Sequence, residues 1–364
     1  MTNYLEPFKL NNGVELRNRY VMAPMTNYSA NPDDTASEEE LAYYEERSYG
    51  VGAVITACTY VIANGKGFPG QFAGHTDAYI ESLGKVAQAI HKGGAKAILQ
   101  IYHGGRQSPK NLLPNGDVVA PSDIVIGGEL RARGLTIEEI EEIVKAFGET
   151  TRRAIEAGYD GVEIHGANTY LLQQFFSGFT NKRTDKYGGT VEKRMRFPLE
   201  VIAEVNRVKA QYADDSFIVG YRFSPEEPEE DGITLDETVK LVDRLADESL
   251  DYLHISLADF RSLARRYKGE KENRIKILHR VINGRVPFIG VGSIYSKEDA
   301  LEAMETGAEL LALGRELLIE PHWVEKIKAG EEVITKMDMT RDNVIPKPLM
   351  NKMKAHPGWV PGVR

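Results

Sequence analysis

Eight short apolar segments recur along the chain, and residues that favour turns bound each of them. Continuous apolar runs of this length fit strands that are buried on both faces, as in a parallel sheet. Helical patterns separate the segments, and a strand followed by a helix, eight times over, is typical of an α/β fold, the (β/α)8 or TIM barrel. The strong preference for right-handed connections leaves few competing topologies. The segments start at Arg19, Gly52, Ala95, Tyr159, Ser216, Asp251, Val286 and Glu309.

Several helix starts can be read from capping boxes, in which a Ser or Thr is followed three residues later by Glu. Residues 37–40, 136–139 and 234–237 match this pattern, and Ser296 is a candidate N-cap. We therefore expect helices to begin after the first, third, fifth and seventh strands.

Two segments lie outside the repeat. Residues 10–16 (LNNGVEL) predict an N-terminal β-hairpin with a tight Asn12-Gly13 turn, which serves as a lid under the barrel floor. After Pro321 one further helix-like piece precedes an irregular C-terminal tail, residues 354–364, which is rich in Pro and Gly. Since composition does not break anywhere along the chain, we expect a single domain over residues 1–364.

Composition narrows the class of partner. A net charge of −9 argues against nucleic acid and against anionic membranes. The single cysteine, Cys58, rules out an intrachain disulfide and a CxxC zinc site, and no other pattern has the spacing of metal ligands. The chain start lacks a secretory pattern, and no apolar run approaches the ~18 residues of a membrane span. We expect a cytoplasmic protein that acts on a small molecule and binds no metal. The sequence leaves open whether the chain forms a homo-oligomer.

Glycine-rich sequence follows the seventh and eighth apolar segments, at GVGS (290–293) and LGRE (313–316). Active sites of TIM barrels lie at the carboxyl ends of the strands, and the loops after strands seven and eight often bind phosphate. Glycine lets backbone N–H groups approach a ligand, and Arg315 adds a forked cationic donor. Either motif alone fits a simple tight turn equally well, but together they predict a phosphate site.

The other strand ends suggest what carries the phosphate. No G-x-G-x-x-G or G-x-x-x-x-G-K motif is present. Gln100 after strand three offers a planar amide, and Arg222 after strand five offers a fixed cation. A cation near N1 and C2=O of a flavin would stabilise its anionic reduced form, so this set suits a flavin ring.

Five motifs in order make the chain resemble the old yellow enzyme family of FMN-dependent ene-reductases. The most specific is HGANTYLLQQFFSGFTNKRTDKYGG, residues 165–189, with its H-x-x-N-x-Y core. RYVMAPMT, LQIYHGGR, GVGSI and ALGRELLIEP match at the expected strands. The resemblance covers nearly the whole chain, which lacks the cysteines and the length of the family's larger iron–sulfur relatives.

The resemblance implies a reaction and a set of roles. Hydride would pass from NADH or NADPH through FMN to an activated alkene, with Tyr170 donating the proton. His165 and Asn168 would hold the carbonyl or nitro oxygen, and Tyr28 would line the substrate pocket or simply pack there. It further implies the cofactor contacts Pro24, Met25, Thr26, Cys58, Gln100, His165, Arg222, Gly292, Ser293, Gly314 and Arg315.

Some interpretations stay open. Cys58 is a flavin neighbour or a small buried apolar side chain. Thr169 replaces the family's usual glycine, and a β-branched residue at φ > 0 would be costly and could re-aim Tyr170. Trp359 or Arg364 reaches a neighbouring subunit, or belongs to a loose tail. Alternative functions are a flavin oxidase or quinone reductase, a flavin-binding protein with an inactive substrate site, and a flavin-free barrel that binds a sugar phosphate.

Overall fold

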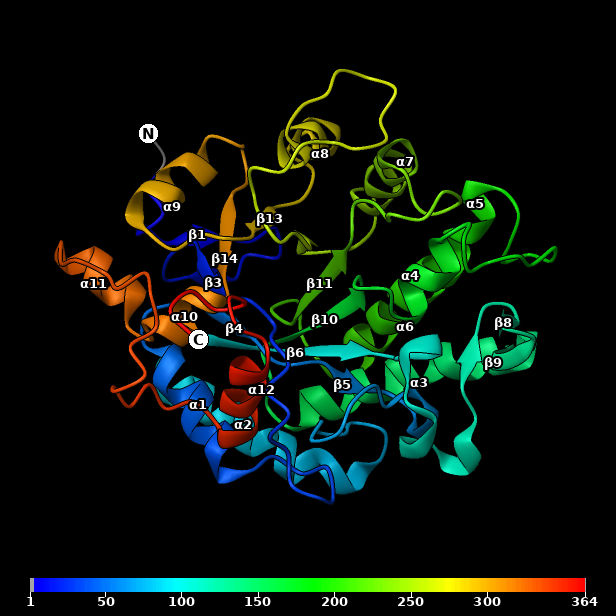
Figure 1. The fold of residues 1–364 in the computed structure, drawn as a ribbon, viewed down its shortest axis with the longest axis horizontal. Coiled ribbons are helices and arrows are strands. Elements are labelled where there is room, and N and C mark those ends of the chain that lie inside the picture. Colours follow the sequence, from blue (N-terminus) through cyan, green and yellow to red (C-terminus); the bar gives the residue numbers. More distant parts are fainter. Residues whose placement is uncertain (1–2, 364) are drawn as a thin grey trace.

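The computed structural model describes residues 3–363 and contains a closed barrel of eight parallel strands (Figure 1). Each strand lies inside one of the eight predicted segments. Strand β14 pairs with β3, and β6 pairs with both β4 and β10, which closes the ring. The barrel strands are β3 (Tyr20–Met22), β4 (Ala53–Ile55), β6 (Lys96–Tyr102), β10 (Gly161–Gly166), β11 (Ile218–Phe223), β12 (Tyr252–Ile255), β13 (Phe288–Val291) and β14 (Leu310–Leu313).

The barrel strands are buried along their length, apart from the half-buried Lys96 at the start of β6. This explains their unbroken apolar runs, because side chains fill the barrel interior on one face and contact the helices on the other. A short extra strand, β5 (Thr59–Tyr60), pairs with β6 beyond the end of β4.

Helices surround the barrel, and the predicted caps are confirmed. Ser37, Thr136, Thr234 and Ser296 each form a capping box at the start of a helix. The outer helices are α1 (Glu38–Ser48), α2 (Ile80–Lys92), α3 (Ile137–Glu156), α4 (Leu171–Phe176), α5 (Val191–Arg194), α6 (Arg196–Tyr212), α7 (Leu235–Leu245), α8 (Arg274–Ile282), α9 (Lys297–Met304) and α10 (Arg315–Ile319). None of the helices in residues 3–363 combines the length and the apolarity needed to cross a membrane.

The N-terminal hairpin closes the floor of the barrel, as predicted. Strands β1 (Phe8–Lys9) and β2 (Glu15–Leu16) pair antiparallel, and Gly13 takes a φ of +90° in the turn between them. Asn11 Nδ2 donates to Arg285 O at 2.8 Å, just before β13 begins. Leu16 is buried, so the hairpin packs against the amino ends of the strands.

A small sheet after β6 was not predicted. It consists of β7 (Val119–Ala120), β8 (Ile124–Ile126) and β9 (Glu129–Gly134), and it is preceded by the 3₁₀ turns Gly105–Gln107, Lys110–Leu112 and Pro114–Gly116. Two further 3₁₀ turns, Ala63–Gly65 and Asp77–Tyr79, follow β5. Gly127 and Gly128 both take positive φ between β8 and β9. A Gly-Gly pair between two strand-like runs is a hairpin signal, and it identifies this sheet in retrospect.

The C-terminal segment is more ordered than a loose tail. It contains two helices, α11 (Trp323–Ala329) and α12 (Lys347–Ala355), where the sequence predicted one. The stretch after α12 is irregular, as expected, but Val360 and Val363 are buried and Met337 N donates to Pro361 O at 2.7 Å. Arg364 lies outside the described residues.

Candidate active site

A cavity of about 530 Å³ opens at the carboxyl ends of the barrel strands. Most of the predicted site residues share its wall, which confirms that the strand ends converge. Those residues are Pro24, Met25, Thr26, Tyr28, Asn168, Arg222, Gly292, Ser293, Gly314 and Arg315.

One end of the cavity is built from the loops after β13 and β14. Gly292 takes a φ of +119°, and a Cβ there would lie 2.7 Å from Asp259 N, so only glycine fits. Arg315 Nη2 donates to Ser293 Oγ at 2.9 Å. Among residues 3–363 no carboxylate forms an ion pair with Arg315, so its charge is free to meet an anion.

Toward the barrel interior the cavity ends at Arg222 on β11. Its side chain is buried, and its Nε has no partner among the described residues. Burial lowers the pKa of Arg222, while the charge of Glu163 raises it, and an arginine remains charged in either case. A buried guanidinium with an open donor fits an acceptor edge of a bound molecule.

His165, Tyr170, Gln100 and Cys58 are not among the residues that line this cavity. His165 and Tyr170 pack against Tyr102, and Gln100 donates to Glu163 inside the barrel. The His165 ring lies 6.0 Å from the Tyr102 ring and 5.2 Å from the Tyr170 ring, between centroids. Burial lowers the pKa of His165, so the imidazole is neutral, and burial raises the pKa of Tyr170, so the phenol keeps its proton.

Cys58 packs among Tyr60, Phe68 and Tyr102, in a cluster that Tyr28 and Tyr170 border. Burial raises the pKa of its thiol to about 12. The side chain is therefore a neutral thiol in an apolar cluster.

The loop after β10 holds two residues in the left-handed region. Asn168 has a φ of +57° and Thr169 a φ of +63°, so the position of Thr169 does require φ > 0. Hydrogen bonds offset this cost: Gln107 Nε2 donates to Thr169 Oγ1 at 2.7 Å, and Thr169 N donates to Gln173 Oε1 at 2.9 Å. Tyr170 packs edge-on against Tyr102 at 4.7 Å between centroids, so it is held firmly despite the threonine.

Asn168 is fixed by serines from the next two strands. Its backbone N donates to Ser224 Oγ at 2.9 Å, after β11. Ser256 Oγ, after β12, donates to Asn168 Oδ1 at 2.7 Å. With Oδ1 engaged, the amide presents Nδ2 as a donor.

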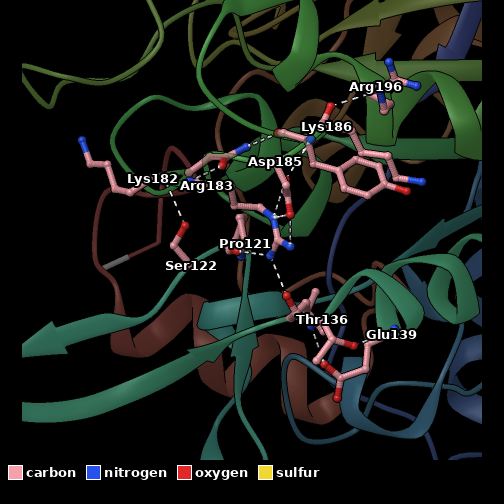
Figure 2. A network of polar contacts seen from close by, with 12 residues as sticks. Pro121, Ser122, Thr136, Glu139, Lys182, Arg183, Asp185, Lys186 and Arg196 are labelled. Carbon is pink, nitrogen blue, oxygen red and sulfur yellow. Dashed lines mark hydrogen bonds and ion pairs between the residues drawn. The ribbon is translucent and has the colours of Figure 1, made fainter.

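The long polar loop that follows is held by the contacts shown in Figure 2. Arg183 Nε donates to Asp185 Oδ2 at 3.0 Å, and Arg183 Nη1 donates to Pro121 O at 2.7 Å. Tyr187 Oη donates to Glu200 at 2.8 Å. These motif residues pin the loop and take no part in the cavity wall.

The family model described as NADH:flavin oxidoreductase / NADH oxidase matches residues 4–333. The chain belongs to this family. YqiG of Bacillus subtilis (strain 168), a probable NADH-dependent flavin oxidoreductase, is 52% identical over 98% of this chain and 97% of its own length. NADH:fumarate oxidoreductase of Klebsiella pneumoniae (strain 342) is 42% identical over 95% of this chain, which spans only 38% of that longer protein.

Solved structures agree with this assignment. Morphinone reductase in complex with tetrahydroNAD shares 29% identity, covers 92% of each chain and gives a TM-score of 0.77. The old yellow enzyme homologue from Zymomonas mobilis has the same fold, with a TM-score of 0.80, 24% identity, and 95% of this chain and 99% of that one covered. The resemblance to the old yellow enzyme family and the TIM barrel are both confirmed. The chain is an NAD(P)H-dependent FMN oxidoreductase.

The cavity of this NADH:flavin oxidoreductase fits FMN. The orphaned donor of Arg222 lies at one end, and the glycine turn with the unpaired Arg315 lies at the other. In the described part of the chain no three His, Cys, Asp or Glu side chains gather closely enough to share a metal ion.

Sequence reasoning missed two groups of residues at this site. Lys352 and His356 line the cavity from the C-terminal segment, with Lys352 Nζ 5.2 Å from the centre of the Tyr28 ring, and no motif marks them. Trp359, which the sequence predicted to reach a neighbouring subunit or to lie in a loose tail, lines the same cavity. Glu163 and His254 are buried inside the barrel, and a charged residue within an apolar strand is a signal that could have found them.

Proposed function

We propose that this flavin oxidoreductase reduces the C=C bond of activated alkenes, either α,β-unsaturated carbonyl or nitro compounds, with Tyr170 as proton donor. One observation carries this proposal: a protonated Tyr170 and a neutral His165 lie 5.2 Å apart between ring centroids, on the strand end where Asn168 presents a donor. The similarity to NADH:fumarate oxidoreductase and to NADH:acrylate oxidoreductase of Vibrio harveyi supports alkene substrates.

When bound, FMN would supply the hydride chemistry, with NADH or NADPH as the source of electrons. The chain's own residues then act on the substrate oxygen and on the proton. His165 and Asn168 donate to the carbonyl or nitro oxygen, where negative charge grows, so their bonds strengthen as the reaction proceeds. Tyr170, protonated throughout the neutral range, gives its Oη proton to the alkene carbon.

The proposal includes a set of cofactor contacts. Arg222 and Gln100 would hold the polar edge of the ring, with His165 beside them, and Cys58 would close the site from behind. Phosphate would bind between Ser293 and Arg315. The strand-one residues Pro24, Met25 and Thr26, with Gly292 and Gly314, would complete the wall, and Tyr28 would face the substrate.

A second candidate function is transfer of electrons to oxygen or quinones. NADH oxidase of Thermoanaerobacter brockii is 37% identical over 87% of this chain, which spans 49% of that protein. Anaerobic reoxidation by an enone separates the two functions, because the reduced flavin of an ene-reductase is reoxidised by an enone in the absence of air.

The test is anaerobic reoxidation of the NADH-reduced enzyme by cyclohexenone. We expect Tyr170→Phe to slow this step about 100-fold or more, the usual contribution of a positioned acid, without loss of FMN. Tyr212→Phe, at an exposed tyrosine at the end of α6, serves as the control.

Unchanged reoxidation in Tyr170→Phe would overturn the role of Tyr170. If the reduced wild-type enzyme does not react with the enone but reacts rapidly with oxygen, the protein is better described as an oxidase. Bound FMN with no turnover of any activated alkene would indicate an inactive substrate site.

A further inference from the structure

Three buried polar side chains form a continuous chain inside the barrel, behind the wall of the FMN cavity. Gln100 on β6, Glu163 on β10 and His254 on β12 are 2%, 0% and 0% exposed. Gln100 Nε2 donates to Glu163 Oε1 at 2.7 Å, and the His254 Nδ1 to Glu163 Oε2 distance is 2.8 Å. Nothing in the proposed reaction uses Glu163 or His254.

The bonds dictate how Gln100 is oriented. An ionised carboxylate only accepts hydrogen bonds, so Gln100 must turn Nε2 toward Glu163 and leave Oε1 for another partner. Without Glu163, the amide of Gln100 could present either its oxygen or its nitrogen to a ligand. One carboxylate therefore decides whether Gln100 offers a ligand an acceptor or a donor.

The carboxylate is ionised even though it is fully buried. Burial opposes its charge, but His254, Arg222 and Gln100 together outweigh burial and lower the pKa of Glu163. Burial and the charge of Arg222 lower the pKa of His254 more than Glu163 raises it, so the ring is neutral and donates from Nδ1. Glu163 is therefore the anion of this chain of side chains.

Arg222 is the cation that compensates this buried anion. It lies in register with His254 on the neighbouring strand. In the described part of the chain no ion pair joins Arg222 to a carboxylate, so Glu163 balances its charge from a distance and leaves its N–H groups available. A buried charge is costly without such compensation.

We propose that Glu163 is a positioning residue for the FMN site: it fixes the amide of Gln100 in one orientation and offsets the charge of Arg222 beside the flavin. The inference rests on the proposed FMN contacts of Gln100 and Arg222. It gives the anion a definite consequence, because the net charge felt by the flavin sets how strongly the reduced, anionic form is favoured.

The test is the midpoint potential of bound FMN, together with FMN affinity, in Glu163→Gln. We expect the variant to bind FMN with a more positive potential, because Arg222 is no longer offset. Reduced FMN should gain about tenfold in affinity relative to oxidised FMN, which equals about 30 mV for a two-electron couple. An unchanged potential would overturn the proposal.

Two variants separate charge from packing. Glu163→Asp keeps the charge but is too short to hold both Gln100 and His254, so FMN affinity should fall about tenfold with little change in potential. His254→Gln disturbs the same buried contact but leaves Glu163 charged, so its potential should also stay near that of wild type. A potential that shifts equally in all three variants would contradict the proposal.

If Glu163→Gln does not fold, Glu163→Asp decides the positioning role, and an unchanged FMN affinity overturns it. Asp251→Asn removes a buried carboxylate at the opposite end of β12 and should leave the potential unaltered. The potential is measured without any alkene, so failure of this inference is distinguishable from failure of Tyr170 as proton donor.

Discussion

At the scale of single residues, the loop after β10 combines unfavourable backbone geometry with several hydrogen bonds that hold it in place. Asn168 and Thr169 both take φ near +60°, which costs of order 1–3 kcal/mol for a non-glycine residue. Serines from two other strands and two glutamines satisfy the loop's polar groups. The strain is therefore retained where Asn168 and Tyr170 must point in fixed directions.

Ser256→Ala should weaken catalysis without harming the fold. Loss of the bond to Asn168 Oδ1 lets the amide rotate, so its donor is no longer held in place for the substrate oxygen. We expect anaerobic reoxidation by cyclohexenone to slow about tenfold, equivalent to about 1.4 kcal/mol, the size of one hydrogen bond.

Ser216→Ala is the matched control, because Ser216 lies before β11 at the floor and its hydroxyl donates to nearby Asp214. Equal rates in Ser256→Ala and wild type would show that Asn168 is oriented by other contacts.

Site residues were predictable from sequence where they follow a strand within a motif. Asn168, Arg222 and Arg315 were all placed on one cavity in this way. Glu163 and His254 stand out as charged residues within apolar strands, but their pairing was not predictable, because the two strands lie far apart in the chain. Their bond depends on barrel closure, which no local pattern encodes.

At the scale of elements, α12 and the chain after it form part of the cavity wall. Leu349 and Met353 are buried on one face of α12, while Lys352 and His356 line the cavity. Arg315 Nη1 donates to Trp359 O at 3.2 Å, which ties this segment to the eighth strand end. The segment thus forms part of the cavity wall from within the same chain.

Leu349→Ala should loosen this cover. Truncating a fully buried leucine costs about 2–5 kcal/mol, and we expect faster FMN release below the melting temperature. Stopped-flow recording of FMN fluorescence measures the rate at which FMN is released.

Leu16→Ala, at a buried position of the floor hairpin, should lose similar stability without faster release. Equal release from both variants would mean that general destabilisation, and not α12, controls FMN retention.

Elements with strong patterns were predicted well, and those defined by tertiary contact were not. All eight barrel strands and four helix caps were found, because burial on both faces and capping chemistry leave local signatures. The ordered packing of residues 356–363 was not predicted, because Val360 and Val363 become buried only when the segment packs on the barrel.

At the scale of the whole molecule, we propose that the chain is a single domain. The strands form one closed ring, and the core extends from Tyr4 near the floor to Val363 in the C-terminal segment. Stability and binding should therefore be coupled throughout the structure.

We expect one cooperative thermal transition, with FMN released at the same temperature. A hundredfold excess of free FMN over its Kd should add about 2.7 kcal/mol to the free energy of unfolding. Calorimetry with and without FMN measures both, and two separate transitions would contradict a single domain.

The positions of Tyr4 and Val363, near the two ends of the described residues, have a practical consequence for protein engineering. Tyr4 is anchored at the floor, whereas Trp359 lines the cavity and Val363 packs close by on the opposite side of the barrel. An affinity tag, fluorescent label or surface tether at the N-terminal end sits away from the cofactor. The same attachment at the C-terminal end would strain the segment that lines the cavity. Immobilised or fused forms are therefore best built through the N-terminal end.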